Sequence, residues 1–431
     1  MPATPSAKAA AAFAALSRFE VEAGVKGIPP QACPIALGEI GRQGWSVLNG
    51  DVTLPALTLS ASRLAHNSAL MRDYLSSRDV ALAPHGKTTL APQLFALQVA
   101  DGAWAITIST VQHLAVCRRF DFRRLILANQ VVGRAEVAAL YAELEAAPEL
   151  ELYVLVDSLA GVEHLLAGAD GRAGRLNVLV EVGMPGGRAG CRTTAEALAI
   201  AAAAAGGGLS VRGVEGFEGI LGSAAEVDAF LDHLCEVAAA ISHAGHFAPG
   251  EIILTAGGSA YYDRVAHRLA AHADLGAPVR IVARSGCYLT HDSGSYAAAF
   301  EAVQAREQAL AEKAFAPALL VLAHVQSRPD ADKAIVTLGR RDAGFDAGLP
   351  VPLVVFRAGR DARPVPVEAG VVLTAMNDQH GHLKVPETSD IAVGDIVGFG
   401  ISHPCTTFDK WPVLLVVDDD YRVVDAIKTF F

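Results

Sequence analysis

Residues 152–182 read LYVLVDSLAGVEHLLAGADGRAGRLNVLVEV, and the rest of the chain repeats their pattern. Two short apolar runs, Leu152–Asp157 and Asn177–Val182, flank a helical stretch, as in a strand–helix–strand unit. Both runs are almost continuously hydrophobic, which is typical of parallel strands that are buried on both faces. Six further runs of this kind are Val80–Ala83, Trp104–Ser109, Arg124–Ala128, Gly213–Phe217, Glu251–Thr255 and Val279–Arg284. Eight such units in about 210 residues predict a (β/α)8 barrel of the α/β class.

The pattern changes near residue 318. Strand-like runs such as Ala318–Gln326 and Ala334–Leu338 are broken by Gly, Pro and Asp, and long helical patterns are absent. This predicts a second, mainly β domain, which a strand at Val52–Leu59 is expected to join. We therefore expect an N-terminal extension over residues 1–50 that partly joins the β domain, a barrel over residues 51–300, and a C-terminal β domain over residues 301–431.

Composition excludes several classes of protein. The chain has 431 residues, with 35 basic and 46 acidic side chains and a net charge of −11, which argues against nucleic-acid binding. No apolar run approaches the roughly 20 residues that a membrane span needs. The six cysteines lie far apart without a C-x-x-C pair, which predicts reduced thiols and a cytoplasmic protein. The Ala-rich run at 9–16 only weakly resembles a signal peptide.

Polar or glycine-rich clusters follow nearly every predicted strand, at the end where barrel enzymes place their chemistry. The first cluster, Pro84–Thr89, contains Lys87, the only lysine between Lys26 and Lys313 among eight in the chain. An imine to a carbonyl cofactor requires a primary amine, which arginine does not supply. By position alone, Lys87 is equally well interpreted as a cofactor lysine or as an ordinary surface lysine.

The segment Thr255–Ser259, TAGGS, follows the seventh predicted strand. Barrels often bind a phosphate there through backbone N–H groups. Gly257 and Gly258 would let the backbone approach the anion, and Ser259 adds a hydroxyl donor. A plain turn is the simpler interpretation of this segment by itself. Combined with Lys87, the segment outlines a site for a phosphorylated aldehyde.

His403 and Cys405, in GISHPCTTFD, are candidate zinc ligands, one imidazole and one thiolate. Catalytic zinc normally takes three protein ligands, and only two are identified here. For an isolated H-x-C pair, a hydrogen-bonded histidine and a buried cysteine are the simpler alternative.

Taken together, these segments resemble the fold-type III pyridoxal-phosphate (PLP) enzymes of the D-serine dehydratase and D-threonine aldolase family, distant relatives of alanine racemases. The resemblance covers roughly residues 50–431. Pro84–Thr88 is similar to the family's P-H-x-K-T segment, which implies that Lys87 binds PLP as a Schiff base and that His85 contacts the cofactor. Glu181–Gly190 is similar to its strand-five segment, in which an arginine, here Arg188, lies near the pyridine nitrogen.

The two remaining segments carry the resemblance further. Thr255–Ser259 is similar to the family's phosphate loop, which implies that Gly257, Gly258 and Ser259 bind the cofactor. His403–Thr407 is similar to the H-x-C metal segment of the dehydratases, which implies zinc on His403 and Cys405. Aldolase relatives more often have a carboxylate where Cys405 stands.

The resemblance implies a lyase that uses PLP and zinc to eliminate water from a 3-hydroxy D-amino acid such as D-serine, giving a 2-oxo acid and ammonia. Lys87 would remove the α-proton, and a metal that lowers the pKa of bound water from about 15.7 to about 7 would contribute at most about 12 kcal/mol. It also implies a homodimer. The alternatives are a D-threonine-type aldolase, a PLP-binding protein without turnover, and a phosphosugar barrel enzyme.

Two positions depart from the family pattern. Relatives commonly carry His where this chain has Thr89, and a Tyr-His pair where it has Phe217–Glu218. These positions are expected to touch the substrate, so they leave its identity open.

Overall fold

The computed structural model describes residues 6–271 and 274–431, which form two compact units. The first unit comprises residues 71–87 and 95–286, and the second comprises residues 6–70, 88–94 and 287–431. The boundaries predicted at residues 50 and 300 stay predictions.

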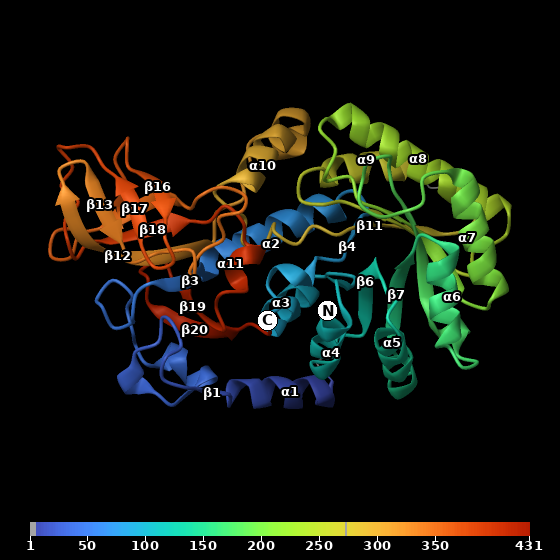
Figure 1. Ribbon diagram of the computed structural model, residues 1–431, viewed down its shortest axis with the longest axis horizontal. Helices are drawn as coiled ribbons and strands as arrows, with labels where there is room; N and C mark the ends of the chain where they lie inside the picture. The colour runs from blue at the N-terminus through green and yellow to red at the C-terminus, as the bar shows by residue number, and fades with distance from the viewer. Residues whose placement is uncertain (1–5, 272–273) are drawn as a thin grey trace. The chain divides into compact units, whose positions relative to one another are not determined.

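An eight-stranded parallel sheet forms the centre of the first unit (Figure 1). Its strands are β4 (Ala81–Leu82), β5 (Ile106–Ile108), β6 (Arg124–Gln130), β7 (Glu151–Val156), β8 (Asn177–Val182), β9 (Ser210–Gly216), β10 (Ile252–Ala256) and β11 (Val279–Ala283). One side of β4 pairs with β11. On its other side the chain joins β5 through a His85–Thr107 bridge, in which the Thr107 N–H donates to the Pro84 carbonyl at 3.0 Å. The sheet therefore closes on itself, and the predicted barrel is confirmed.

Helices connect successive strands and lie along the outside of the sheet in Figure 1. They are α4 (Val111–Arg119), α5 (Arg134–Ala146), α6 (Leu159–Ala167), α7 (Thr194–Gly206), α8 (Ala224–His243) and α9 (Tyr262–Ala271), and earlier in the chain α2 (Ala61–Ser76) and α3 (Pro92–Ala100) occur. Four of these barrel helices begin at a hydroxyl N-cap, namely Thr110, Ser158, Thr193 and Ser223. A capping hydroxyl satisfies a backbone N–H of the first turn. These capping residues therefore fix where the loops after β5, β7, β8 and β9 end and the next helices begin.

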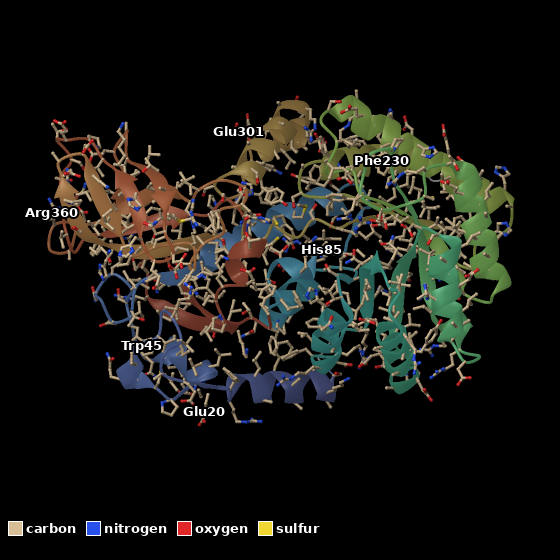
Figure 2. All side chains as sticks on the ribbon, viewed as in Figure 1. Glu20, Trp45, His85, Phe230, Glu301 and Arg360 are labelled. Carbon is tan, nitrogen blue, oxygen red and sulfur yellow. The ribbon has the colours of Figure 1, made fainter. Side chains whose placement is uncertain are left out.

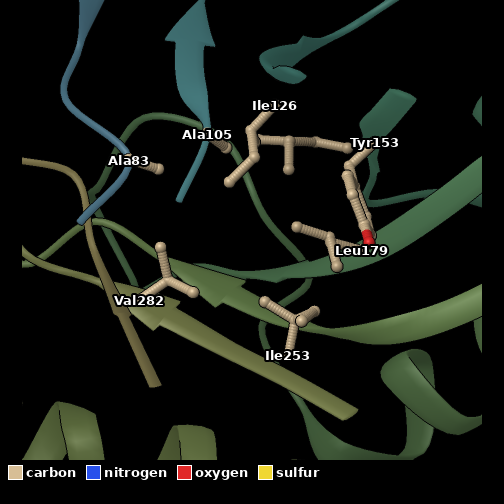
Figure 3. Close-up of a cluster of buried hydrophobic side chains, with 8 residues drawn as sticks. Ala83, Ala105, Ile126, Tyr153, Leu179, Ile253 and Val282 are labelled. Carbon is tan, nitrogen blue, oxygen red and sulfur yellow. The ribbon is translucent and has the colours of Figure 1, made fainter. Parts of the chain in front are cut away.

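The barrel interior is packed with side chains (Figure 3). Ile126, Leu179 and Val282 are fully buried in this cluster, and Ile253 is 2% exposed. Each fully buried aliphatic side chain stabilises the fold by about 1.5–3 kcal/mol. The filled interior makes the barrel a rigid support for the loops at its carboxyl end.

The second unit is built on a mainly antiparallel sheet. Its strands are β3 (Ala56–Ser60), β12 (Leu319–Asp330), β13 (Lys333–Val336), β14 (Val351–Phe356), β15 (Val365–Pro366), β16 (Val372–Met376), β17 (Gly381–Lys384), β18 (Ile396–Gly400), β19 (Val413–Val417) and β20 (Val423–Lys428). The predicted N-terminal strand is present as β3, which pairs with β12 and β19. The unit also contains α10 (Ser295–Arg306) and the short α11 (Cys405–Phe408). The prediction that the second domain is mainly β is therefore confirmed.

The N-terminal segment belongs to this second unit. It contains α1 (Ala7–Ser17), β1 (Glu20–Val21) and β2 (Ile35–Ala36). The Val47 N–H donates to the Tyr421 carbonyl at 3.0 Å, which holds the segment beside β20. Across residues 6–271 and 274–431, no helix is both long and apolar enough to cross a bilayer.

Candidate active site

Lys87 lies in a short 3-10 turn, Gly86–Thr88, just after β4. A Cβ atom at position 86 would lie 2.8 Å from the Phe95 ring and 3.0 Å from Ile106, so only glycine fits this tight approach. The exposed Lys87 side chain borders a cavity of about 310 Å³ at the carboxyl end of the barrel. His85, Arg188, Gly257 and Gly258 border the same cavity. Five of the six residues predicted to bind the cofactor are thus gathered around one cavity.

His85 precedes Lys87 by two residues and is labelled in Figure 2. Its Nδ1 atom is buried and has no hydrogen-bond partner in the described part of the chain. Burial, together with the positive charges of Lys87 and Arg284, holds the pKa of His85 well below its ordinary value. The ring is therefore neutral near pH 7, and its buried Nδ1 atom has a hydrogen-bonding capacity that the described residues do not use.

The Gly257–Gly258 segment follows β10 and already binds an anionic group. Gly257 has φ +101°, a conformation that L side chains rarely adopt. The Gly257 N–H donates to Glu218 Oε2 at 2.9 Å, and the Gly258 N–H donates to Glu218 Oε1 at 2.7 Å. The Ser285 hydroxyl donates to the Gly258 carbonyl at 3.0 Å, which holds the loop in place. The Glu218 carboxylate acts here as a stand-in anion, so the chemistry of the loop fits a phosphate.

The sequence predicts Ser259 as a third phosphate ligand. It follows Gly258 but is not among the residues that border the cavity. Its role in binding stays a prediction.

Arg188 extends from the loop between β8 and α7. Its guanidinium lies 5.2 Å from the centre of the Phe217 ring, in a cation–π contact. Glu181, at the end of β8, is buried and accepts a hydrogen bond from Gln130. Burial raises the pKa of Glu181, although Gln130 and Arg188 oppose the shift.

A buried ion pair that the sequence analysis did not identify forms part of the cavity wall. Arg284, after β11, donates to Glu215 of β9, to Thr255 Oγ1 at 3.0 Å and to the Gly216 carbonyl at 3.1 Å. Burial raises the pKa of Glu215 to about 7 in spite of the Arg284 charge. The sequence contained a signal for this pair, because Glu215 and Arg284 are charged residues in two otherwise apolar runs, 213–217 and 279–284.

The second unit holds the predicted metal residues. His403 Nδ1 lies 2.6 Å from Asp346 Oδ2, and Cys405 at the start of α11 lies 3.5 Å from the Thr88 hydroxyl. The Cys287 sulfur is 3.9 Å from that of Cys405. Hydrogen bonds from Cys287 and His403 lower the pKa of Cys405 to about 4, and its thiolate together with Asp346 raises the pKa of His403 to about 9.

The donor set at His403 and Cys405 fits zinc in its chemistry. Within the described ranges, no three His, Cys, Asp or Glu side chains are already arranged as a metal site. Imidazole and thiolate are nevertheless the preferred ligands of zinc, and a carboxylate on the other imidazole nitrogen orients the ring. Two thiolates on one tetrahedral zinc, with Zn–S of about 2.3 Å, lie about 3.8 Å apart. The sulfurs of Cys287 and Cys405 have nearly this separation.

Comparison with known proteins agrees with this geometry. Residues 59–278, just over half of the chain, match the family "Alanine racemase, N-terminal domain", and residues 318–417 match "Putative serine dehydratase domain". The chain is 27% identical over 376 residues to a D-threonine aldolase of Arthrobacter sp., covering 85% of this chain and 90% of that protein. It is 24% identical over 346 residues to a 3-hydroxy-D-aspartate aldolase of Paracoccus denitrificans, covering 77% and 80%.

Among solved structures, the D-threo-3-hydroxyaspartate dehydratase of Delftia sp. HT23 has a similar fold. The TM-score is 0.69 at 22% identity, covering 89% of this chain and 99% of that one.

The fold and the cavity define a PLP-dependent lyase of fold type III. The chain belongs to the alanine racemase N-terminal-domain family, and within it to the branch that carries a serine dehydratase domain. The predicted family, enzyme class and PLP dependence are confirmed. The roles of individual residues stay predictions.

Proposed function

We propose that this lyase eliminates water from a 3-hydroxy D-amino acid such as D-serine, with PLP and zinc as cofactors. The observation that carries the proposal is the position of the Cys405 sulfur, which lies 3.9 Å from that of Cys287 and two residues from the Asp346-bonded His403. Sulfur ligands favour zinc over the harder ions. The water lost in the elimination is taken up again when the enamine product hydrolyses, so the net products are a 2-oxo acid and ammonia.

PLP would be held by the predicted cavity residues. Lys87 Nζ would form the covalent bond to the cofactor's aldehyde carbon, and the N–H groups of Gly257 and Gly258 would hold its phosphate. Neutral His85, which borders the cavity and has an unpartnered Nδ1 atom, would contact the cofactor, and Arg188 would lie near the pyridine nitrogen. When bound, PLP supplies an electron sink for the substrate's α-carbon.

The side chains then act on the substrate's protons and charges. The free amine of Lys87 would take the substrate's α-proton. Besides Lys87, the cations Arg188 and Arg284 border the cavity and make it suitable for an anionic cofactor and an amino-acid carboxylate. Arg284 is already paired with Glu215, whereas Arg188 is exposed and would be the arginine that meets a ligand there.

Zinc would be held by His403 and Cys405, with Asp346 orienting the imidazole. When bound, the metal supplies Lewis-acid stabilisation of a leaving hydroxide. The thiolate of Cys405 and the ring orientation of His403 are the contributions of this chain.

An aldolase is the second candidate, because both sequence relatives described above are aldolases of 3-hydroxy D-amino acids by name. Such an enzyme would split the substrate into glycine, or another amino acid, and an aldehyde. The test is a panel of D- and L-3-hydroxy amino acids, assayed for 2-oxo acid and for aldehyde with and without a chelator. Formation of 2-oxo acid from the D-isomers that stops with chelation supports the dehydratase, whereas aldehyde as the main product refutes it.

We also propose a cytoplasmic homodimer. All six cysteines lie in the described part of the chain and are free thiols, which suits a reducing compartment. Sedimentation of the purified protein tests the assembly, and a monomer at assay concentration would refute it.

A further inference from the structure

Glu218 is a buried carboxylate to which the proposed mechanism gives no role. It follows β9 and is fully buried, with 0% of its surface exposed. Its two oxygens accept hydrogen bonds from Gly257 and Gly258, at 2.9 and 2.7 Å. It thus occupies the two donors that the cofactor's phosphate would use.

Two anions do not share one pair of N–H donors. A carboxylate bound through both of its oxygens makes two charge-assisted hydrogen bonds, each about twice as strong as a neutral one. A phosphate that takes these donors must therefore displace the carboxylate. The negative charge of Glu218 also repels that of neighbouring Glu215 and helps to raise the pKa of Glu215. Movement of Glu218 away from the loop would therefore relieve this repulsion as well.

The chain around Glu218 allows such a displacement. Residues 217–222 form no regular helix or strand between β9 and α8, and they include Gly219 and Gly222. Ile220, in the middle of this segment, is 54% exposed. Beyond Glu218 itself, residues 219–222 are exposed or half-buried, so few buried contacts of these residues oppose a movement of the segment.

We propose that Glu218 is an internal anion that fills the phosphate subsite of the cofactor-free enzyme and leaves it when PLP binds. This inference rests on the proposed placement of PLP at Lys87 and the glycine pair. Glu218 then sets how strongly the site prefers a phosphorylated ligand, because only the phosphate, and not the pyridine ring, has to displace it.

The test compares PLP with pyridoxal, which lacks the phosphate but keeps the aldehyde. The Kd of each is measured by absorbance titration of the cofactor-depleted full chain, for the wild type and for Glu218→Gln. The amide that this substitution introduces would present an N–H to one of the two backbone donors and is therefore displaced more easily. Since hydrogen bonds to charged groups are worth about tenfold or more in affinity, the ratio of the pyridoxal Kd to the PLP Kd should rise at least about tenfold.

Glu181→Gln is the matched control. Glu181 is a second buried carboxylate at the same end of the barrel, but it bonds to Gln130 and to neither glycine. Its substitution should change the affinities for PLP and pyridoxal alike and leave their ratio unchanged. Inorganic phosphate should also compete with PLP at lower concentration in Glu218→Gln than in the wild type or the control.

Glu218→Asp keeps the charge but shortens the side chain by one methylene, so it serves if the Gln variant does not fold. Its carboxylate no longer reaches both donors, and the Kd ratio should again rise. An unchanged or smaller Kd ratio in the variants that fold would overturn the proposed role of Glu218 but would leave the proposed cofactor site in place. If the wild type bound neither PLP nor pyridoxal, the proposed cofactor site would fall as well.

Discussion

Replacing Glu215 with Gln should remove a large pH dependence of stability. Burial raises the pKa of Glu215 to about 7 from its ordinary value of 4.5. The folded protein therefore keeps this proton at pH values where the unfolded chain has lost it. Stability falls as the pH rises from about 4.5 to about 7, by about 3 kcal/mol in total at 1.36 kcal/mol per unit. The amide in Glu215→Gln does not titrate, so the variant lacks this fall.

The assay is thermal unfolding of the wild type and Glu215→Gln at a series of pH values from 5 to 8, without added cofactor. One kcal/mol corresponds to about 2–4 °C in Tm for a unit of 150–250 residues. Between pH 5 and 8 about 2.5 kcal/mol of this change occurs, so the wild type should lose about 5–10 °C relative to the variant across the series. Parallel curves for the two proteins would refute the reasoning, because they would mean that Glu215 is ionised throughout.

Arg284→Met provides a second test of the same pair. The substitution leaves Glu215 buried without its cation, and breaking a buried ion pair from one side costs about 3–5 kcal/mol. The loss should be largest at pH 8 and smaller at pH 5, where Glu215 becomes neutral by protonation. A loss of equal size at both pH values would contradict the pairing.

Three further predictions concern the cofactor loop, the ring and the metal. Gly257→Ala should destabilise the fold by about 1–2 kcal/mol in thermal unfolding, because φ at this position is +101°; an unchanged Tm would show that the loop relaxes freely. Arg188→Ala should cost about 1 kcal/mol or less, because the side chain is exposed and its main contact is the cation–π contact with Phe217. It should nevertheless shift the absorption maximum of bound cofactor, and an identical spectrum would place Arg188 away from the ring. His403→Ala and Cys405→Ser should lose zinc in elemental analysis while keeping the cofactor absorbance, and full zinc content in both would rule them out as ligands.

The barrel was predictable because parallel strands buried on both faces leave continuous apolar runs in the sequence. All eight predicted runs overlap β4–β11. The positions of Lys87, Arg188 and the glycine pair followed from the same pattern, since each lies just beyond a strand end. The strand at β3 was also visible, but its parallel pairing with β19 depends on residues more than 350 positions later in the chain.

The partners of the site residues were not predictable from local sequence. Glu218 reaches Gly257 and Gly258 across 39 and 40 residues, and Cys287 reaches Cys405 across 118. No local pattern marks such pairs, because the closed barrel and the β sheet bring them together. Glu218 was noted only as a departure from the family pattern, and its place on the phosphate loop emerged from the fold.

The central claim is that Lys87 carries the cofactor. It is tested most directly by reducing the PLP-loaded protein with borohydride and identifying the modified peptide by mass spectrometry. The account predicts a pyridoxyl group on Lys87 and none in Lys87→Arg, which keeps the charge but has no primary amine. A pyridoxyl group on another lysine, or a reducible chromophore that survives in Lys87→Arg, would contradict it.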